Sequence, residues 1–206
     1  MGAAVETSSD YFRSEVPAGR SGSWVVEKVS LPERGYDSDS DPRPDCFKYR
    51  PGEYTCLRRG PEQFMTDLYD EWWTQRDALR EALARGGEVL ITGLGLGLIA
   101  EAMLRQPKGR VSRVTVVELS PDVIRLVALY LTGRYPGRIE VVEGDAFTWT
   151  PPADRRFTVG WHDIWPDPYD PAVAGEIERL EQRYRPWCDW QGSWPRGYLR
   201  AIGSAS

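Results

Sequence analysis

Residues 88–98 read Glu-Val-Leu-Ile-Thr-Gly-Leu-Gly-Leu-Gly-Leu, so an apolar, β-branched run passes directly into alternating glycines. Glycine adopts positive φ without steric cost and lets a ligand approach bare backbone at the carboxyl end of a strand. The glycines are Gly93, Gly95 and Gly97, whereas the dinucleotide-binding fingerprint needs its third glycine at the next position, which is Leu98. The spacing therefore favours a nucleoside ligand without a pyrophosphate.

A second buried strand is predicted at residues 114–118, which read Val-Thr-Val-Val-Glu and end in an acid. Glu118 follows Gly93 by 25 residues, and the ribose-binding acid of dinucleotide sites follows the glycines by about 20 residues. A carboxylate here can accept hydrogen bonds from both hydroxyl groups of a ribose. Ser120 and Pro121 then predict the start of a helix, with serine as the N-cap.

Two further strands are predicted at residues 139–142 and 157–161. Asp145 comes shortly after the first of them, and His162 and Asp163 come directly after the second. Open α/β sheets bind their ligands at the carboxyl ends of the strands. The sequence therefore predicts one site built from the glycines and acids that follow the four strands.

With these motifs, residues 85–165 resemble a class I S-adenosylmethionine-dependent methyltransferase, and most of all its spermidine-synthase-like branch. The resemblance rests on the glycine loop, Glu118 and Asp145, and on Tyr-Asp-Glu at 69–71 for the branch. It implies S-adenosyl-L-methionine as the cofactor, with the glycines at the methionine end, Glu118 on the ribose and Asp145 on the adenine amino group. The cofactor-binding residues that it implies are Gly93, Leu94, Gly95, Gly97, Glu118, Leu119, Asp145, Ala146 and Asp163.

The predicted catalytic residues are Asp163 first and His162 second. A base near the acceptor helps to remove its proton if the acceptor is an amine or a hydroxyl. Two other roles stay open: Asp163 could instead hold the methionine ammonium or a loop amide, and His162, the sole histidine, could satisfy a backbone carbonyl. Trp165, in the loop after the fourth strand, could line the cleft or pack as a lid, whereas Trp161, inside the strand, is expected in the core.

The expected fold class is α/β, with a Rossmann-like open parallel sheet over residues 62–206 in the strand order 3-2-1-4-5. A helix is expected at 66–85 before the glycine-loop strand, and a second one at 171–185. One short fifth strand fits within 187–194. The last two strands of a full class I methyltransferase do not fit in the remaining sequence, so the chain resembles a C-terminally shortened member.

The N-terminal region is expected to differ from this domain. Residues 1–22 are small and polar and predict a flexible tail. Residues 23–61 predict a β-hairpin with strands at 24–29 and 54–57. Between them, residues 32–44 form an acidic, proline-containing loop, which is either a solvated insertion or a flap over the active site.

Composition narrows the class of protein. The 206 residues carry a net charge of −5, which argues against a surface that coats nucleic acid. Apolar runs are far shorter than the roughly 20 residues of a membrane span, and the N-terminus lacks the basic-then-apolar order of a signal peptide. A cytoplasmic location and no membrane partner are therefore expected. Cys46, Cys56 and Cys188 have no paired spacing, so neither a disulfide framework nor a metal site is expected.

The predicted function is transfer of a methyl group to an unidentified small-molecule or peptide acceptor. One alternative is a spermidine-synthase-like aminopropyltransferase, although that family has aspartate at the position of Leu96 and paired acids that Asp163 and its neighbours do not reproduce. The other alternative is a non-catalytic S-adenosylmethionine-binding protein, because the missing strands usually help to shape the acceptor pocket. A homodimer is a further hypothesis, since the tryptophans at 187–194 could seal a sheet edge or an interface.

Overall fold

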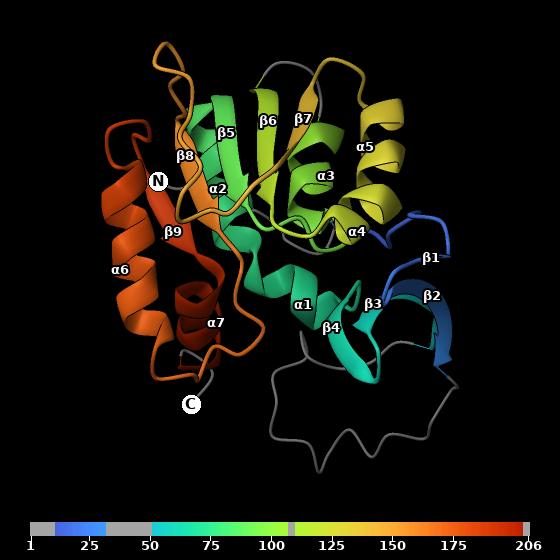
Figure 1. The fold of residues 1–206 in the computed structure, drawn as a ribbon. Helices are drawn as coiled ribbons and strands as arrows, with labels where there is room; N and C mark the ends of the chain where they lie inside the picture. The colour runs from blue at the N-terminus through green and yellow to red at the C-terminus, as the bar shows by residue number, and fades with distance from the viewer. Residues whose placement is uncertain (1–10, 32–50, 107–109, 204–206) are drawn as a thin grey trace, which may run out of the picture.

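The computed structural model describes residues 11–31, 51–106 and 110–203, and it contains two sheets (Figure 1). The larger sheet has five parallel strands in the order β7-β6-β5-β8-β9. Its strands are β5 (Gly87–Thr92), β6 (Val111–Glu118), β7 (Ile139–Glu143), β8 (Val159–His162) and β9 (Gln191–Ser193). The strand order 3-2-1-4-5 and the α/β fold class predicted from the sequence are therefore confirmed.

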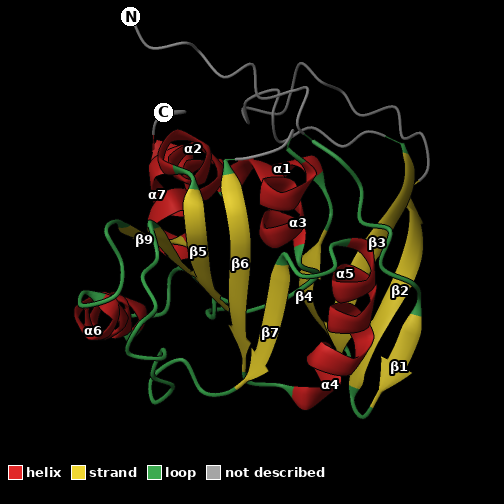
Figure 2. Cartoon of the chain, turned by 90° about the horizontal axis from the view of Figure 1, so that it is seen from above, coloured by secondary structure: helices red, strands yellow, loops and turns green. Residues whose placement is uncertain are grey.

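Helices cover both faces of this sheet (Figure 2). The helices of the chain are α1 (Tyr69–Thr74), α2 (Arg76–Arg85), α3 (Leu98–Arg105), α4 (Pro121–Val123), α5 (Leu129–Arg134), α6 (Val173–Tyr184) and α7 (Trp194–Gly203), with a π-helical turn, η2 (Ile124–Ala128), between α4 and α5. Successive residues of β5 point to opposite faces. Val89 and Ile91 pack in the core that includes α2 and α3, whereas Leu90 packs in the core that includes α6.

The smaller sheet is antiparallel and lies beside the carboxyl edge of the larger one. Its strands are β1 (Gly19–Ser21), β2 (Trp24–Leu31), β3 (Gly52–Arg59) and β4 (Glu62–Thr66), in the order β1-β2-β3-β4. Two side-chain contacts join the smaller sheet to the rest of the chain. Ser21 Oγ of β1 donates to Asp122 Oδ1 of α4 at 2.7 Å, and Met65 Sδ of β4 accepts from the amide of Leu96 in the glycine loop at 3.2 Å. Met65 therefore places β4 directly on the glycine loop.

Two expectations about the N-terminal region and one about the first helix need correction. The predicted two-stranded hairpin is part of a four-stranded sheet, because turns at Gly22 and Gly60, both with positive φ, add one short strand on each side. Residues 19–21, expected in a flexible tail, form β1. The helix predicted at 66–85 begins three residues later and is divided at Gln75, whose φ of −94° and ψ of 0° separate α1 from α2. The acidic loop at 32–44 lies outside the described residues.

The C-terminal expectations are close to the structure. The helix predicted at 171–185 is α6, and Asp170 Oδ1 accepts from the amide of Ala172 at 2.8 Å just before it. The fifth strand lies at β9, inside the predicted range. In the part of the chain that the structure describes, no helix is both long enough and apolar enough to cross a membrane.

Candidate active site

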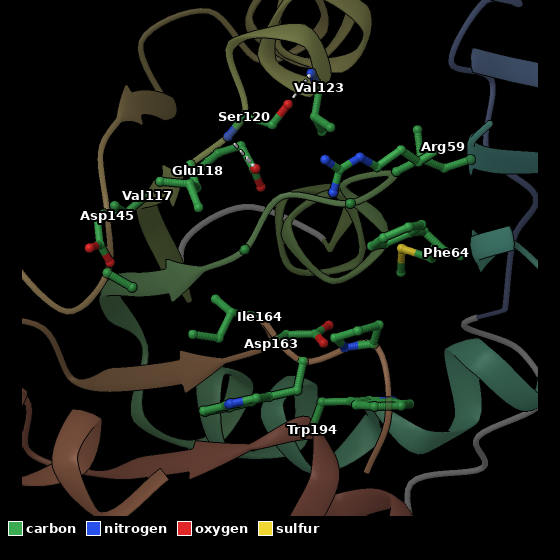
Figure 3. Close-up of a pocket in the computed structure, with 18 of the residues that line it drawn as sticks. Arg59, Phe64, Val117, Glu118, Ser120, Val123, Asp145, Asp163, Ile164 and Trp194 are labelled. Carbon is green, nitrogen blue, oxygen red and sulfur yellow. Dashed lines mark hydrogen bonds between the residues drawn. The ribbon is translucent and has the colours of Figure 1, made fainter. Parts of the chain in front are cut away.

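A cavity of about 500 Å³ lies at the carboxyl ends of β5, β6, β7 and β8 and is also lined by residues of the N-terminal sheet (Figure 3). This volume is within the range of roughly 300–1,000 Å³ that is usual for small-molecule sites. Seven residues expected from the sequence line it, namely Gly93, Gly95, Glu118, Leu119, Asp145, Ala146 and Asp163. Leu94, Gly97 and His162 were also expected at the site, but they are not among the residues that line this cavity.

The glycine loop is shaped by the packing of the protein itself. Gly93, Gly95 and Gly97 have φ values of 94°, 50° and 73°, a region that favours glycine. A Cβ atom on Gly93 would overlap the carbonyl oxygen of Asp163, and one on Gly95 would lie 2.5 Å from Met65 Sδ. A Cβ on Gly97 would meet α5 instead of the cavity. The three glycines thus hold the loop close to its neighbours and leave its edge as part of the cavity wall.

Glu118 joins the ends of β5 and β6. Its Oε2 accepts from the amide of Leu94 at 2.7 Å, and its Oε1 accepts from the amide of Ser120 at 2.8 Å. Burial raises the pKa of Glu118, and hydrogen bonds from the backbone amides of Leu94, Ser120 and Leu119 act against the rise. Each carboxylate oxygen has a second lone pair. The carboxylate is therefore fixed in the cavity wall and keeps lone-pair capacity for a ligand hydroxyl.

The end of β7 forms the neighbouring part of the wall. Asp145 Oδ1 accepts from the amide of Phe147 at 2.8 Å, which fixes the turn after the strand. The carbonyl of Ala146 accepts from the Tyr184 hydroxyl of α6 at 2.7 Å. Leu119 is 70% exposed although it lines the cavity, so an apolar side chain stands at the rim between Glu118 and this turn.

Asp163 lies across the cavity from Glu118 and Asp145, in the loop after β8 (Figure 3). Its amide donates to the carbonyl of Thr92 at 2.8 Å, and its Oδ2 accepts from Nε2 of Gln75 at 3.1 Å. Burial raises the pKa of Asp163 to about 7, and the charge of Glu118 adds to the rise. A carboxyl with this pKa exchanges protons readily near neutral pH, which suits a general base.

Glu71 of α1 also places a carboxyl group in the cavity wall, and the sequence did not single it out as a catalytic or binding residue. Burial raises the pKa of Glu71 to about 8, and the charges of Asp163 and Asp70 add to the rise. Glu71 is therefore mostly protonated at neutral pH, next to a partly ionised Asp163. The signal that could have found it is the Tyr-Asp-Glu sequence at 69–71, which carried part of the family resemblance.

Gln75 was also missed, and its place explains how Asp163 is held. It is 1% exposed and occupies the break between α1 and α2. Its Nε2 donates to Asp163, whereas its Oε1 is buried and has no hydrogen-bond partner among the described residues. No local sequence pattern indicates this hydrogen bond, because Gln75 and Asp163 are 88 positions apart in the chain.

His162 lies in the core, which contradicts its expected catalytic role. Its side chain is 0% exposed, and its ring stacks on Tyr184 with 5.5 Å between the centroids. Nδ1 lies 3.0 Å from Thr92 Oγ1, and Nε2 lies 3.0 Å from Gln191 Oε1. Burial lowers the pKa of His162 to about 4. The histidine is thus a neutral residue that ties β8 to β5 and β9.

The aromatic residues after β8 divide between core and cavity. Trp161 is 0% exposed, as expected for a residue inside the strand. Trp165 lines the cavity and donates from Nε1 to Glu176 of α6 at 2.7 Å, while Trp194 lines it from α7. Tyr169 is 61% exposed and contacts the ring of Tyr198. Among the described residues, no group of three or more histidine, cysteine or acidic side chains is arranged to hold a metal ion.

Comparison with known proteins gives similarity at the level of the fold. No protein-family model and no curated protein matches the sequence. Similar solved structures include the 23S rRNA methyltransferase ErmE (24% identity, TM-score 0.42) and the mitomycin 7-O-methyltransferase MmcR (24%, 0.45). The cyclase SpnF is another (19%, 0.39). The matches cover 56%, 60% and 66% of this chain but only 41%, 34% and 40% of those three.

Proposed function

We propose that this protein is an S-adenosylmethionine-dependent methyltransferase that acts on an amine or hydroxyl of a small-molecule or peptide acceptor. One observation carries the proposal: a single cavity at the carboxyl edge of the parallel sheet joins the glycine loop, Glu118, Asp145 and Asp163. These groups stand on four different strands or their following loops. The glycine loop, Glu118 and Asp145 are also groups on which the resemblance to class I methyltransferases rests.

The residues present fit the proposed cofactor. S-Adenosylmethionine carries a sulfonium and an ammonium group, and the cavity wall contains the carboxyl groups of Glu71, Glu118, Asp145 and Asp163. Glu118 has lone pairs available for a ribose diol, and Leu119 offers an exposed apolar side chain beside them. The neutral form of Glu71 at pH 7 also limits the charge in the cavity when it is empty of ligand. We propose Gly93, Gly95, Glu118, Leu119, Asp145 and Ala146 as the cofactor contacts, and Asp163 as a group that contacts the acceptor.

When bound, the cofactor supplies an electrophilic methyl group. Methyl transfer is an in-line displacement, so the residues of the chain contribute mainly by position. We assign to Asp163 the removal of the acceptor's proton, because its carboxyl lines the cavity and its pKa is raised to about 7. Gln75 acts as a positioning residue, since its amide fixes one carboxylate oxygen of Asp163. Protonated Glu71 can donate a hydrogen bond to the acceptor.

Aminopropyl transfer is the weaker alternative. Leu96 stands where aminopropyltransferases have an aspartate, and its side chain is 0% exposed, while its amide donates to Met65. The chain therefore presents no acid at that point of the loop. A non-catalytic binding protein remains the other alternative, and it is separated from an enzyme by the experiment on Asp163 described in the Discussion.

The proposal is tested by calorimetric titration of S-adenosylmethionine and S-adenosylhomocysteine into the wild type and a Glu118→Gln variant. Loss of the charged contact to the ribose is expected to weaken binding by about ten- to a hundredfold. The matched control is Glu143→Gln, because Glu143 is the register partner of Glu118 on β7 but does not line the cavity. Absence of binding to the wild type, or equal losses in both variants, would refute the proposed cofactor site.

A further inference from the structure

The N-terminal sheet brings a cation and two aromatic rings into the wall of the same cavity. Arg59 ends β3, and its register partner on the neighbouring strand β2 is Trp24. The guanidinium carbon of Arg59 lies 5.8 Å from the centroid of the Trp24 ring, and the rings of Trp24 and Phe64 meet edge to face at 4.6 Å. All three residues line the cavity, and the Arg59 side chain reaches into it between Phe64 and Ser120 (Figure 3).

Arg59 differs from its neighbour Arg58 in what it contacts. Successive residues of a strand point to opposite faces. Arg58 pairs with Glu27 at 3.3 Å and donates to the carbonyl of Pro61 at 2.8 Å. Arg59 instead contacts the ring of Trp24, and within the described part of the chain no ion pair joins Arg59 to a carboxylate. Among the described residues, none takes up the hydrogen-bond donors of the Arg59 guanidinium, so these donors can bind a ligand.

Among the described residues that line the cavity, Arg59 is the only basic one. The other ionised or ionisable side chains of the wall are carboxyl groups, namely Glu71, Glu118, Asp145 and Asp163. Carboxyl groups suit a cationic or neutral ligand group, whereas a guanidinium presents a planar fork of donors that matches a carboxylate. The acidic groups thus lie on α1 and at the carboxyl edge of the parallel sheet, whereas the basic group lies with two aromatic rings on the N-terminal sheet.

Building on the proposed function, we infer that Arg59 binds a carboxylate group of a bound ligand, with Trp24 and Phe64 against the carbon skeleton that carries it. Two ligands can supply this group: an acceptor that is a carboxylic acid, or the amino-acid end of the cofactor. In both cases specificity for the carboxylate comes from the N-terminal sheet and not from the carboxyl edge of the parallel sheet.

The test measures three probes by calorimetry on the wild type, Arg59→Gln and Arg58→Gln. S-Adenosylhomocysteine has the amino-acid carboxylate, whereas 5′-methylthioadenosine lacks it. Benzoate, a flat carboxylate, is titrated into both ligand-free protein and protein saturated with S-adenosylhomocysteine. Arg58→Gln is the matched control, since it removes the same charge at the adjacent position on the other face of β3.

A contact of Arg59 with a ligand carboxylate is worth about three- to tenfold in affinity, because this residue is exposed at the rim of the cavity. If the acceptor supplies the group, Arg59→Gln weakens benzoate by this factor and leaves S-adenosylhomocysteine unchanged. If the cofactor supplies it, Arg59→Gln weakens S-adenosylhomocysteine and leaves 5′-methylthioadenosine unchanged. Either pattern supports the inference, provided that Arg58→Gln binds the same probes as the wild type does.

The inference is overturned if Arg59→Gln matches the wild type for all three probes, or if Arg58→Gln loses as much affinity as Arg59→Gln. Its failure is distinguishable from failure of the proposed function. If neither nucleoside binds the wild type, the methyltransferase proposal falls. The benzoate titration of ligand-free protein still decides whether Arg59 binds a carboxylate.

Discussion

Replacement of Glu71 by glutamine is expected to stabilise the protein, and more so as the pH rises. The pKa of Glu71 is raised from 4.5 to about 8, chiefly by burial. Between these two values the folded chain holds a proton that the unfolded chain has released, so the wild type loses stability as the pH increases through this window. Glutamine is neutral at every pH and avoids the loss.

The size of the effect follows from the shift. A difference of 3.5 pKa units, from 4.5 to about 8, corresponds to at most about 5 kcal/mol at 1.36 kcal/mol per unit. Part of the rise comes from the charge of Asp163, and ionised Glu71 can recruit water from the cavity. We therefore expect Glu71→Gln to raise the free energy of unfolding by roughly 1–3 kcal/mol at pH 9.

Urea unfolding, followed by tryptophan fluorescence from pH 4.5 to pH 9, measures this difference. The stability of Glu71→Gln minus that of the wild type should be close to zero at pH 4.5, grow up to about pH 8 and then level off. Glu178→Gln, on the exposed side of α6, is the control and should show no such growth. A difference for Glu71→Gln that stays constant across the range, or falls as the pH rises, would refute the reasoning about its burial.

Further predictions concern the base, the histidine and the glycine loop. Asp163→Asn should lower the rate of S-adenosylhomocysteine formation by roughly a hundredfold or more. The affinity of this variant for S-adenosylhomocysteine, measured by calorimetry, should stay within about threefold of the wild type. Unchanged turnover would exclude Asp163 as the base. His162→Ala should cost roughly 2–4 kcal/mol in urea unfolding with S-adenosylhomocysteine binding retained, whereas a stable variant with lost binding would contradict its placement in the core. Gly93→Ala should destabilise the protein by roughly 3 kcal/mol or more, because its Cβ would overlap the Asp163 carbonyl oxygen. Gly133→Ala is the control and should not destabilise the protein, since a Cβ there would stand in open space on α5. Equal melting temperatures for these two variants would disprove the packing argument.

The sequence by itself determined the parallel sheet and the edge of the sheet at which the cavity lies. Runs of β-branched residues at 88–92 and 114–117 are long and apolar enough to define buried strands, and each ends at a glycine or an acid. Parallel strands place their carboxyl ends at the same edge. Glu118, Asp145 and Asp163 could therefore be gathered at one edge without knowledge of side-chain contacts, and the structure places all three in one cavity.

The tertiary structure alone decided what faces this edge. Local periodicity reports which face of a strand or helix is buried, but it does not show which distant element covers it. His162 is the last residue of β8 and directly precedes Asp163, yet alternation along the strand turns the His162 side chain into the core. Glu71 and Arg59 reach the cavity because α1 and the N-terminal sheet pack across the carboxyl edge. Contacts of this kind depend on the packing of elements far apart in the chain, so this half of the cavity could not be predicted from the sequence.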